Sequence, residues 1–159
     1  MRPDPWIWLT VPLSLLLALL VELLPFPQPL AQLQPPWLLL VVLYWSILQP
    51  AILGMAGAWL MGLVLDTIQP SFLGTHAALF TLVVTPVLAL QRLLRTLPVA
   101  QQALWIAGLV FLYEVGELLL GGQLTAGRVT AHDFLPVIST LIIWPLLRVL
   151  LHRCERCLG

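Results

Sequence analysis

The chain has 159 residues, of which 60% are hydrophobic and only 9% are charged, and its mean hydropathy is +1.01. About a quarter of the residues in an ordinary soluble domain are charged, so this chain lacks the polar side chains needed to cover an aqueous surface. Its seven basic residues are all arginines, and seven acids balance them, which leaves no net charge and no basic face for nucleic acid. The composition excludes a soluble enzyme and a nucleic-acid-binding domain, and it indicates an integral membrane protein.

Prolines and polar residues divide the chain into six apolar segments, each a candidate transmembrane helix because crossing a bilayer takes about 20 apolar residues. The segments cover residues 6–24, 37–49, 51–68, 74–91, 102–121 and 134–151. The first is longer than a signal-peptide core of about 7–15 residues and runs into prolines, so we expect a retained membrane anchor. Residues 25–36 follow it with five prolines and no charge, and they predict an extended external loop. We expect one all-α domain over residues 1–159, a polytopic membrane bundle of about six transmembrane helices.

The second segment, 37–49, is short for a membrane span. Its 13 residues would rise only about 20 Å as a helix, against about 30 Å of hydrocarbon, and Pro50 ends it. Residues 37–68 together are too long for one transmembrane helix and too short for two full-length ones. They predict either a tight helical hairpin or a broken helix that neighbouring helices protect from lipid.

Arginine placement predicts the orientation, because positively charged loops stay in the cytoplasm. With six spans, only Arg128 falls on the external side. The other arginines lie on or near the opposite side, and they are Arg2, Arg92, Arg95, Arg148, Arg153 and Arg156. We therefore expect both termini in the cytoplasm. Aromatic residues near the predicted span ends are expected to anchor the helices at the membrane interface, and they are Trp6, Trp8, Trp37, Tyr44, Trp45 and Trp105.

Acidic residues inside the apolar segments are functional candidates, because a charge in a span is costly. They are Glu22, Asp66, Glu114 and Glu117, and the predicted topology puts all of them in the outer half of their helices, with Asp133 and Arg128 close by. Glu114 and Glu117 are three residues apart, so they share one helix face.

Asp66 ends a row of small residues at a spacing of four, the pattern that lets two helices approach closely. The row is Gly54, Ala58, Gly62 and Asp66. One interpretation makes it a packing seam that carries the acid to a partner, such as Arg128 or a hydroxyl-bearing helix. The other is that acids near the span ends stay hydrated and only terminate their helices.

The sequence contains no recognisable catalytic set. It has neither a Gly-x-Ser-x-Gly nor a His-Glu-x-x-His motif, and His76 and His132 stand in predicted loops or at a span end without ligand spacing. His152, Cys154 and Cys157 offer three soft ligands, but we interpret them as part of an unstructured cytoplasmic tail with free thiols. We expect no catalytic residue, no bound metal and no cofactor.

Several short motifs, in order over roughly residues 6–153, carry a resemblance to a known family. They are Pro36-Trp37 through Tyr44-Trp45, Gly62-Leu63-Val64-Leu65-Asp66, Phe72-Leu73-Gly74, Gln101-Gln102-Ala103-Leu104 and Trp144-Pro145. Together with the total length and the hydropathy profile, this ordered set resembles the rod shape-determining membrane protein family MreD.

The resemblance implies a multi-pass protein of the bacterial inner membrane that belongs to the elongasome and has no enzymatic activity of its own. It implies direct binding to MreC, a single-span periplasmic protein. It also implies a part in joining the actin-like MreB filament to RodA and its penicillin-binding-protein partner, which synthesise peptidoglycan and maintain rod shape. Self-association and contact with membrane lipid are further expectations. The family is also similar in architecture to the six-helix substrate-binding components of vitamin transporters.

Two functions therefore compete. In the first the chain is a scaffold, and its helix seams and outer acidic face bind MreC. In the second it is a vitamin-type carrier whose outer acids coordinate a small molecule, although the first segment lacks the Ala-x-x-x-Ala pattern with which such carriers engage their energising partner. We expect a partner and packing surface formed by Pro36, Trp37, Tyr44, Trp45, Gly54, Ala58, Gly62, Asp66 and Gly74. Intramembrane polar contacts are expected from Glu22, Glu114, Glu117 and Arg128.

Overall fold

The computed structural model describes residues 7–27, 30–69, 72–122, 126–127 and 129–158, and all regular structure within them is helical. The helices are α1 (Ile7–Glu22), α2 (Trp37–Leu48), α3 (Met55–Ile68), α4 (Thr75–Thr96), α5 (Val99–Leu120) and α6 (Leu135–Leu158), with 3-10 turns η1 (Leu30–Leu33) and η2 (Ala131–Phe134). The predicted all-α class is confirmed. Among the described residues, three helical stretches are long and apolar enough to cross a membrane, in α4, in α5 and over His132–Leu151, whereas α1, α2 and α3 are shorter apolar helices.

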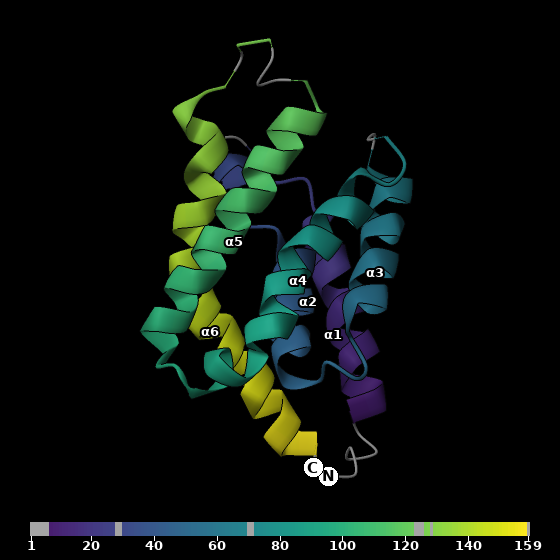
Figure 1. Ribbon diagram of the computed structural model, residues 1–159, viewed down its shortest axis with the longest axis vertical. Helices are drawn as coiled ribbons and strands as arrows, with labels where there is room; N and C mark the ends of the chain where they lie inside the picture. The colour runs from purple at the N-terminus through teal and green to yellow at the C-terminus, as the bar shows by residue number, and fades with distance from the viewer. Residues whose placement is uncertain (1–6, 28–29, 70–71, 123–125, 128, 159) are drawn as a thin grey trace.

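Successive helices run in opposite directions, so that α1 begins and α6 ends at the same end of the bundle (Figure 1). We call this the arginine end, because Arg92, Arg95 and Arg148 lie there. We call the opposite end the acidic end, where α1, α3 and α5 finish with Glu22, Asp66 and Glu117 in their last turns. Helices α5 and α6 form one side of the bundle, α1 and α3 form the other, and α2 and α4 lie between them (Figure 1).

Helix α2 is the central helix of the bundle. Ten of its 12 residues are buried, and its neighbours are mainly α1 and α4. A helix of this length rises only about 18 Å, which is tolerated because protein rather than lipid surrounds its backbone. Neither alternative for residues 37–68 is met in full: α2 and α3 are separate helices that run in opposite directions and are joined by residues 49–54. Helix α3 packs along α4 and makes few contacts with α2, so the two do not form a tight hairpin.

The burial of α2 corrects the prediction for its aromatic residues. Tyr44 and Trp45 are both buried, so neither anchors the bundle at the membrane interface nor presents a surface to a partner. The Trp45 indole Nε1 donates a hydrogen bond to Ser14 Oγ on α1, at 2.8 Å. Pro36 is also buried and Trp37 is half-buried. These side chains hold the interior of the bundle, whereas Trp8 and Trp105 are exposed.

The row of small residues on α3 faces α4. Ala58, Gly62 and Asp66 are all buried, and a Cβ atom added to Gly62 would overlap the backbone of Ala77 on α4. The predicted close approach of two helices is therefore present, but its partner is a helix of the same chain. This corrects the hypothesis that the row forms a surface for another protein.

Two helices extend beyond their predicted ends. Helix α4 continues past residue 91 to Thr96, and α6 continues past residue 151 to Leu158, so the segment expected to be an unstructured tail is helical. Neither extension contains a proline or glycine to stop the helix, and arginine in a last turn is favourable to the helix dipole. The side chains of His152, Cys154 and Cys157 lie outside the described part of the chain.

The proline-rich connection between α1 and α2 is more folded than predicted. It contains η1, which packs against α6 at the acidic end. The Gln34 side-chain Nε2 donates to the backbone oxygens of Val21 and Glu22, at 3.3 Å each, and so ties the connection to the end of α1. The segment therefore crosses the acidic end instead of extending away from it.

Candidate functional site

Asp66, in the last turn of α3, accepts backbone hydrogen bonds from the beginning of α4. Its Oδ2 accepts from the N–H groups of Gly74 at 2.9 Å and Ala77 at 3.2 Å, and its Oδ1 accepts from the N–H of His76 at 2.9 Å. The first N–H groups of a helix have no partner within the helix, and Gly74 at the N-cap has no side chain to supply one. The Asp66 carboxylate therefore supplies the side-chain cap that Gly74 cannot provide for the next helix.

Gly74 has a local role in the same turn. Its φ of 97° lies in the left-handed region, which glycine adopts without the penalty that a side chain brings. The sequence predicts Gly74 on a partner surface, and Asp66 beside a partner such as Arg128 or a hydroxyl-bearing helix. In the structure the Gly74 N–H instead donates a hydrogen bond to the Asp66 carboxylate. Arg128 lies outside the described residues.

His76 connects Asp66 to Glu117 on α5. The buried imidazole has Nδ1 at 2.8 Å from Asp66 Oδ1 and Nε2 at 3.3 Å from Glu117 Oε1. Both contacts are hydrogen bonds only when the three groups share two protons, because a neutral imidazole carries a single N–H. The sequence pattern predicts His76 in a loop or at a span end and does not indicate this role. The signal was the short connection of residues 69–74, which brings the start of α4 back to the end of α3.

Glu22, the last residue of α1, has a role like that of Asp66. Its Oε2 accepts a hydrogen bond from the N–H of Leu38 in the first turn of α2, at 3.3 Å. The N-cap of α2 is Pro36, which provides no side-chain cap. An intramembrane polar contact was expected for Glu22, and the observed contact is the cap of a neighbouring helix.

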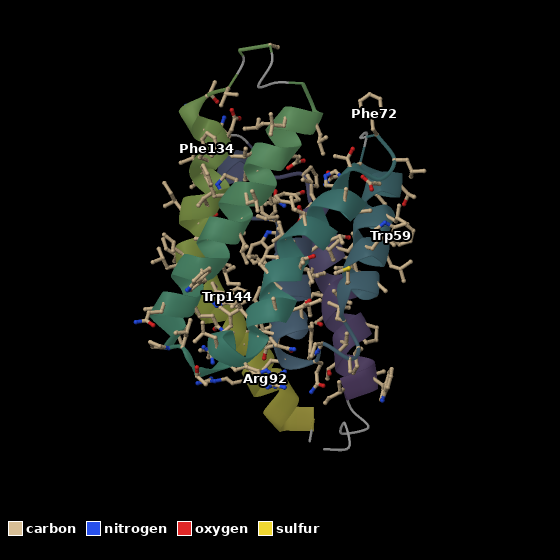
Figure 2. All side chains as sticks on the ribbon, viewed as in Figure 1. Trp59, Phe72, Arg92, Phe134 and Trp144 are labelled. Atoms are coloured by element: carbon tan, nitrogen blue, oxygen red, sulfur yellow. The ribbon has the colours of Figure 1, made fainter. Side chains whose placement is uncertain are left out.

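An open cavity of about 960 Å³ lies at the acidic end, between α4, α5 and the start of α6. We call it the acidic cavity. Its lining combines carboxylates and histidines with apolar side chains and comprises Gln32, Phe72, Thr75, His76, Glu114, Glu117, Leu118, Leu120, Gly121, Thr130, His132, Asp133 and Pro136. Figure 2 shows Phe72 and Phe134 at this end of the molecule, opposite Arg92.

Glu114 and Glu117 project from the same face of α5 into this cavity, as their spacing predicts. Asp133 stands at its edge, where Oδ2 accepts from the Thr130 backbone N–H at 2.7 Å and the Thr130 hydroxyl at 3.1 Å. Thr130 and Asp133 thus form a capping box at the start of η2. The junction between α5 and α6 is capped locally, and the acids of α5 are not used there.

The acidic cavity has few cations to balance its carboxylates. Among the described residues, His76 is the only basic side chain within 4.0 Å of a carboxylate, and no arginine there approaches Glu114, Glu117 or Asp133 to that distance. The cavity is suited to basic or hydrogen-bond-donating groups. In the same part of the chain, no cluster of three or more His, Cys, Asp or Glu side chains has the arrangement of a metal site.

Comparison with known proteins identifies the family. The sequence profile of the family described as rod shape-determining protein MreD matches residues 5–154. The chain belongs to the MreD family. A curated relative, the rod shape-determining protein MreD of Haemophilus influenzae, is 28% identical over 149 residues, which cover 94% of this chain and 92% of the relative. No solved structure matches the chain.

MreD membership assigns the chain a role in the determination of rod shape and places it among membrane proteins, in agreement with its apolar helices. The family is known for its effect on cell shape and not for a catalysed reaction. The motifs that carried the resemblance, from Pro36-Trp37 to Trp144-Pro145, all lie inside the matched range. The likeness to vitamin-transporter components stays a prediction.

Proposed function

We propose that this MreD-family chain is a non-enzymatic scaffold of the cell-elongation machinery and that it binds MreC at its acidic end. The observation that carries the proposal is the acidic cavity, whose carboxylates Glu114 and Glu117 are neither helix caps nor paired with an arginine among the described residues. Basic side chains of a periplasmic partner would complement them in charge. The small-residue row no longer serves as an alternative surface, because α4 covers it.

The other end of the bundle supplies the second contact in this proposal. Arg92 and Arg153 are exposed, and in this proposal such arginines contact the MreB filament. The exposed apolar faces of the helices contact membrane lipid, RodA and its penicillin-binding-protein partner, or a second copy of the chain. The scaffold thereby couples MreB filaments to peptidoglycan synthesis and maintains rod shape.

The proposal places the protein in the bacterial inner membrane as a multi-pass chain with both termini in the cytoplasm. Its support is that Arg92, Arg95 and Arg148 lie at the end where α1 begins and α6 ends, since positive loops remain in the cytoplasm. Cysteine labelling in intact cells tests this orientation. A Cys154→Ser, Cys157→Ser protein carrying Arg128→Cys should react with an impermeant reagent, and a protein with only its native cysteines should not. Labelling of both from outside contradicts the topology.

The test of function combines partner recovery with cell shape. Glu114→Gln keeps the size of the side chain but removes its charge, so we expect less MreC to co-purify with the variant in detergent and a weaker rescue of rod shape in depleted cells. Glu155→Gln removes one acid from α6 near the opposite end and is the matched control. Equal recovery of MreC with both variants and the wild type would refute binding at the acidic end.

The size of the acidic cavity favours one alternative function. Small-molecule sites usually have volumes of roughly 300–1,000 Å³, and the acidic cavity falls within that range. A vitamin-type carrier component would hold a polar or cationic molecule between Glu114 and Glu117. Native mass spectrometry of the protein as purified distinguishes the two functions. A bound vitamin-sized molecule that Glu114→Gln removes would favour the carrier, and MreC retained without such a molecule would favour the scaffold.

A further inference from the structure

A second cavity, of about 380 Å³, lies at the arginine end between α2, α4, α5 and α6. We call it the arginine cavity. Its polar side chains are Tyr44, Arg95, Gln102, Trp144 and Arg148. Its walls also include Val99 and Val149, which are 38% and 53% exposed on the outside of the bundle. It therefore combines an exposed and a half-buried arginine with an apolar margin.

Neutral groups hold both arginines in place. Arg95 donates from Nε to the Ile47 backbone oxygen at 2.7 Å and from Nη2 to that of Leu48 at 2.8 Å, which caps the C-terminus of α2. Arg148 donates from Nη1 to Gln102 Oε1 at 2.7 Å. Because carbonyl and amide oxygens carry no formal charge, these bonds orient the guanidinium groups without neutralising them.

Gln102 is the residue that fixes this arrangement. Its buried amide oxygen also accepts from Trp144 Nε1 at 3.3 Å, and its Nε2 donates to the Leu94 backbone oxygen at 3.2 Å. With both ends of the amide engaged, the carbonyl oxygen can only point toward Arg148. These hydrogen bonds fix the position of the Arg148 guanidinium group within the folded bundle.

The charge of the arginine cavity is uncompensated among the described residues. Neither Arg95 nor Arg148 has a carboxylate there within 4.0 Å. Each guanidinium has five N–H donors, so Arg95 keeps three and Arg148 keeps four beyond the bonds given above. Helix α5 also begins at this cavity with Val99, and the positive end of its dipole adds to the field. Charges within membrane helices are costly unless they are paired.

We propose that the arginine cavity binds the phosphate of an anionic phospholipid, with Arg95 and Arg148 on the phosphate oxygens and an acyl chain over Val99 and Val149. Arginine matches phosphate geometry with paired donors, and basic pockets between membrane helices bind anionic headgroups. The exposed apolar margin favours a lipid over a soluble phosphate, because a free ion gains nothing from it. The site is independent of whether the acidic end binds MreC.

Native mass spectrometry of delipidated protein tests the proposal with three probes, namely dioleoylphosphatidylglycerol, dioleoylphosphatidylcholine and inorganic phosphate. The wild type should retain phosphatidylglycerol in preference to the other two. Arg95→Gln with Arg148→Gln should weaken that binding by about fivefold for each arginine. Arg92→Gln with Arg153→Gln removes the same charge from the same end outside the cavity, and it should leave the binding unchanged.

Arg148→Gln alone keeps the test decisive if the double variant fails to fold, because Arg95 also caps α2. The readout for this single variant is the rise in melting temperature that phosphatidylglycerol causes, which should be smaller than in the wild type. Equal binding of phosphatidylcholine, an equal rise with inorganic phosphate, or an equal loss in the Arg92 and Arg153 control would overturn the proposal.

Discussion

The acidic end contains three helix junctions, and they use their acids in two different ways. At the α1–α2 and α3–α4 junctions, Glu22 and Asp66 accept hydrogen bonds from the first turn of the following helix. At the α5–α6 junction the local box of Thr130 and Asp133 does this work. Glu117, which occupies the equivalent place in the last turn of α5, faces the acidic cavity instead.

The difference teaches how to separate structural from functional acids in this bundle. An acid that accepts from backbone N–H groups replaces bonds that the helix end would otherwise lack, and lipid offers no water in compensation. An acid without backbone donors caps no helix of its own chain: Glu114 is such an acid, and Glu117 contacts the side chain of His76 in the described part of the chain. By this criterion Glu22 and Asp66 stabilise the fold as helix caps, and Glu114 and Glu117 form the surface that we propose binds a partner.

The largest expected effect is that of Asp66→Ala. The substitution leaves three N–H groups at the start of α4 and the His76 imidazole without their acceptor, so we expect a loss of about 3–5 kcal/mol in the free energy of unfolding. Unfolding of the purified protein in mixed micelles measures it. Glu114→Gln is the control because Glu114 caps no helix, and its free energy of unfolding should equal that of the wild type. Similar unfolding of Asp66→Ala and the wild type would contradict the capping role.

A smaller effect is expected at the α3–α4 seam, where α3 packs against α4 at Gly62. This close packing brings Asp66 within hydrogen-bonding distance of the first turn of α4. In Gly62→Ala the new methyl group would overlap the Ala77 backbone, so the helices must separate at a cost of about 1–3 kcal/mol. Gly108→Ala on α5 is the matched control, because a methyl group there meets no atom within 4 Å. Thermal melting in detergent should show a lower midpoint for the first variant only. Equal midpoints would mean that the seam is not tightly packed.

Glu22→Ala should have the smallest effect on stability. It removes one hydrogen bond to the first turn of α2, and loss of a helix cap costs about 1 kcal/mol. Hydrogen exchange at Leu38 locates the effect, since this amide should exchange faster while amides in the middle of α2 remain protected. An unchanged exchange rate at Leu38 would show that Glu22 does not cap α2, and it would contradict the distinction between capping acids and cavity acids.

Much of the fold could be predicted from the sequence, because prolines and polar residues mark helix ends in any solvent. The central position of α2 could not, since a helix that is apolar all round has the same pattern against lipid as against protein. The burial of Tyr44 and Trp45 was missed for that reason. Exposure depends on which helices surround the segment, and local sequence does not specify this.

The two cavities differ in how far the sequence indicates them. The spacing of Glu114 and Glu117 predicts a shared face, and their place inside an apolar segment marks them as candidates. Arg95 and Arg148 each lie near a predicted span end, where arginine is expected for orientation alone. Only tertiary packing brings them to one cavity with Gln102, and the same packing makes His76 a link between two acids.

The most direct test of the central claim compares two double variants that each remove two charges from the acidic end. In Glu22→Gln with Asp66→Asn the caps are altered, and in Glu114→Gln with Glu117→Gln the cavity is altered. Melting temperature and affinity for MreC are measured on the same samples. We predict that the first pair lowers the melting temperature and that the second weakens MreC binding roughly tenfold with little change in melting. Wild-type affinity in the second pair would contradict the account.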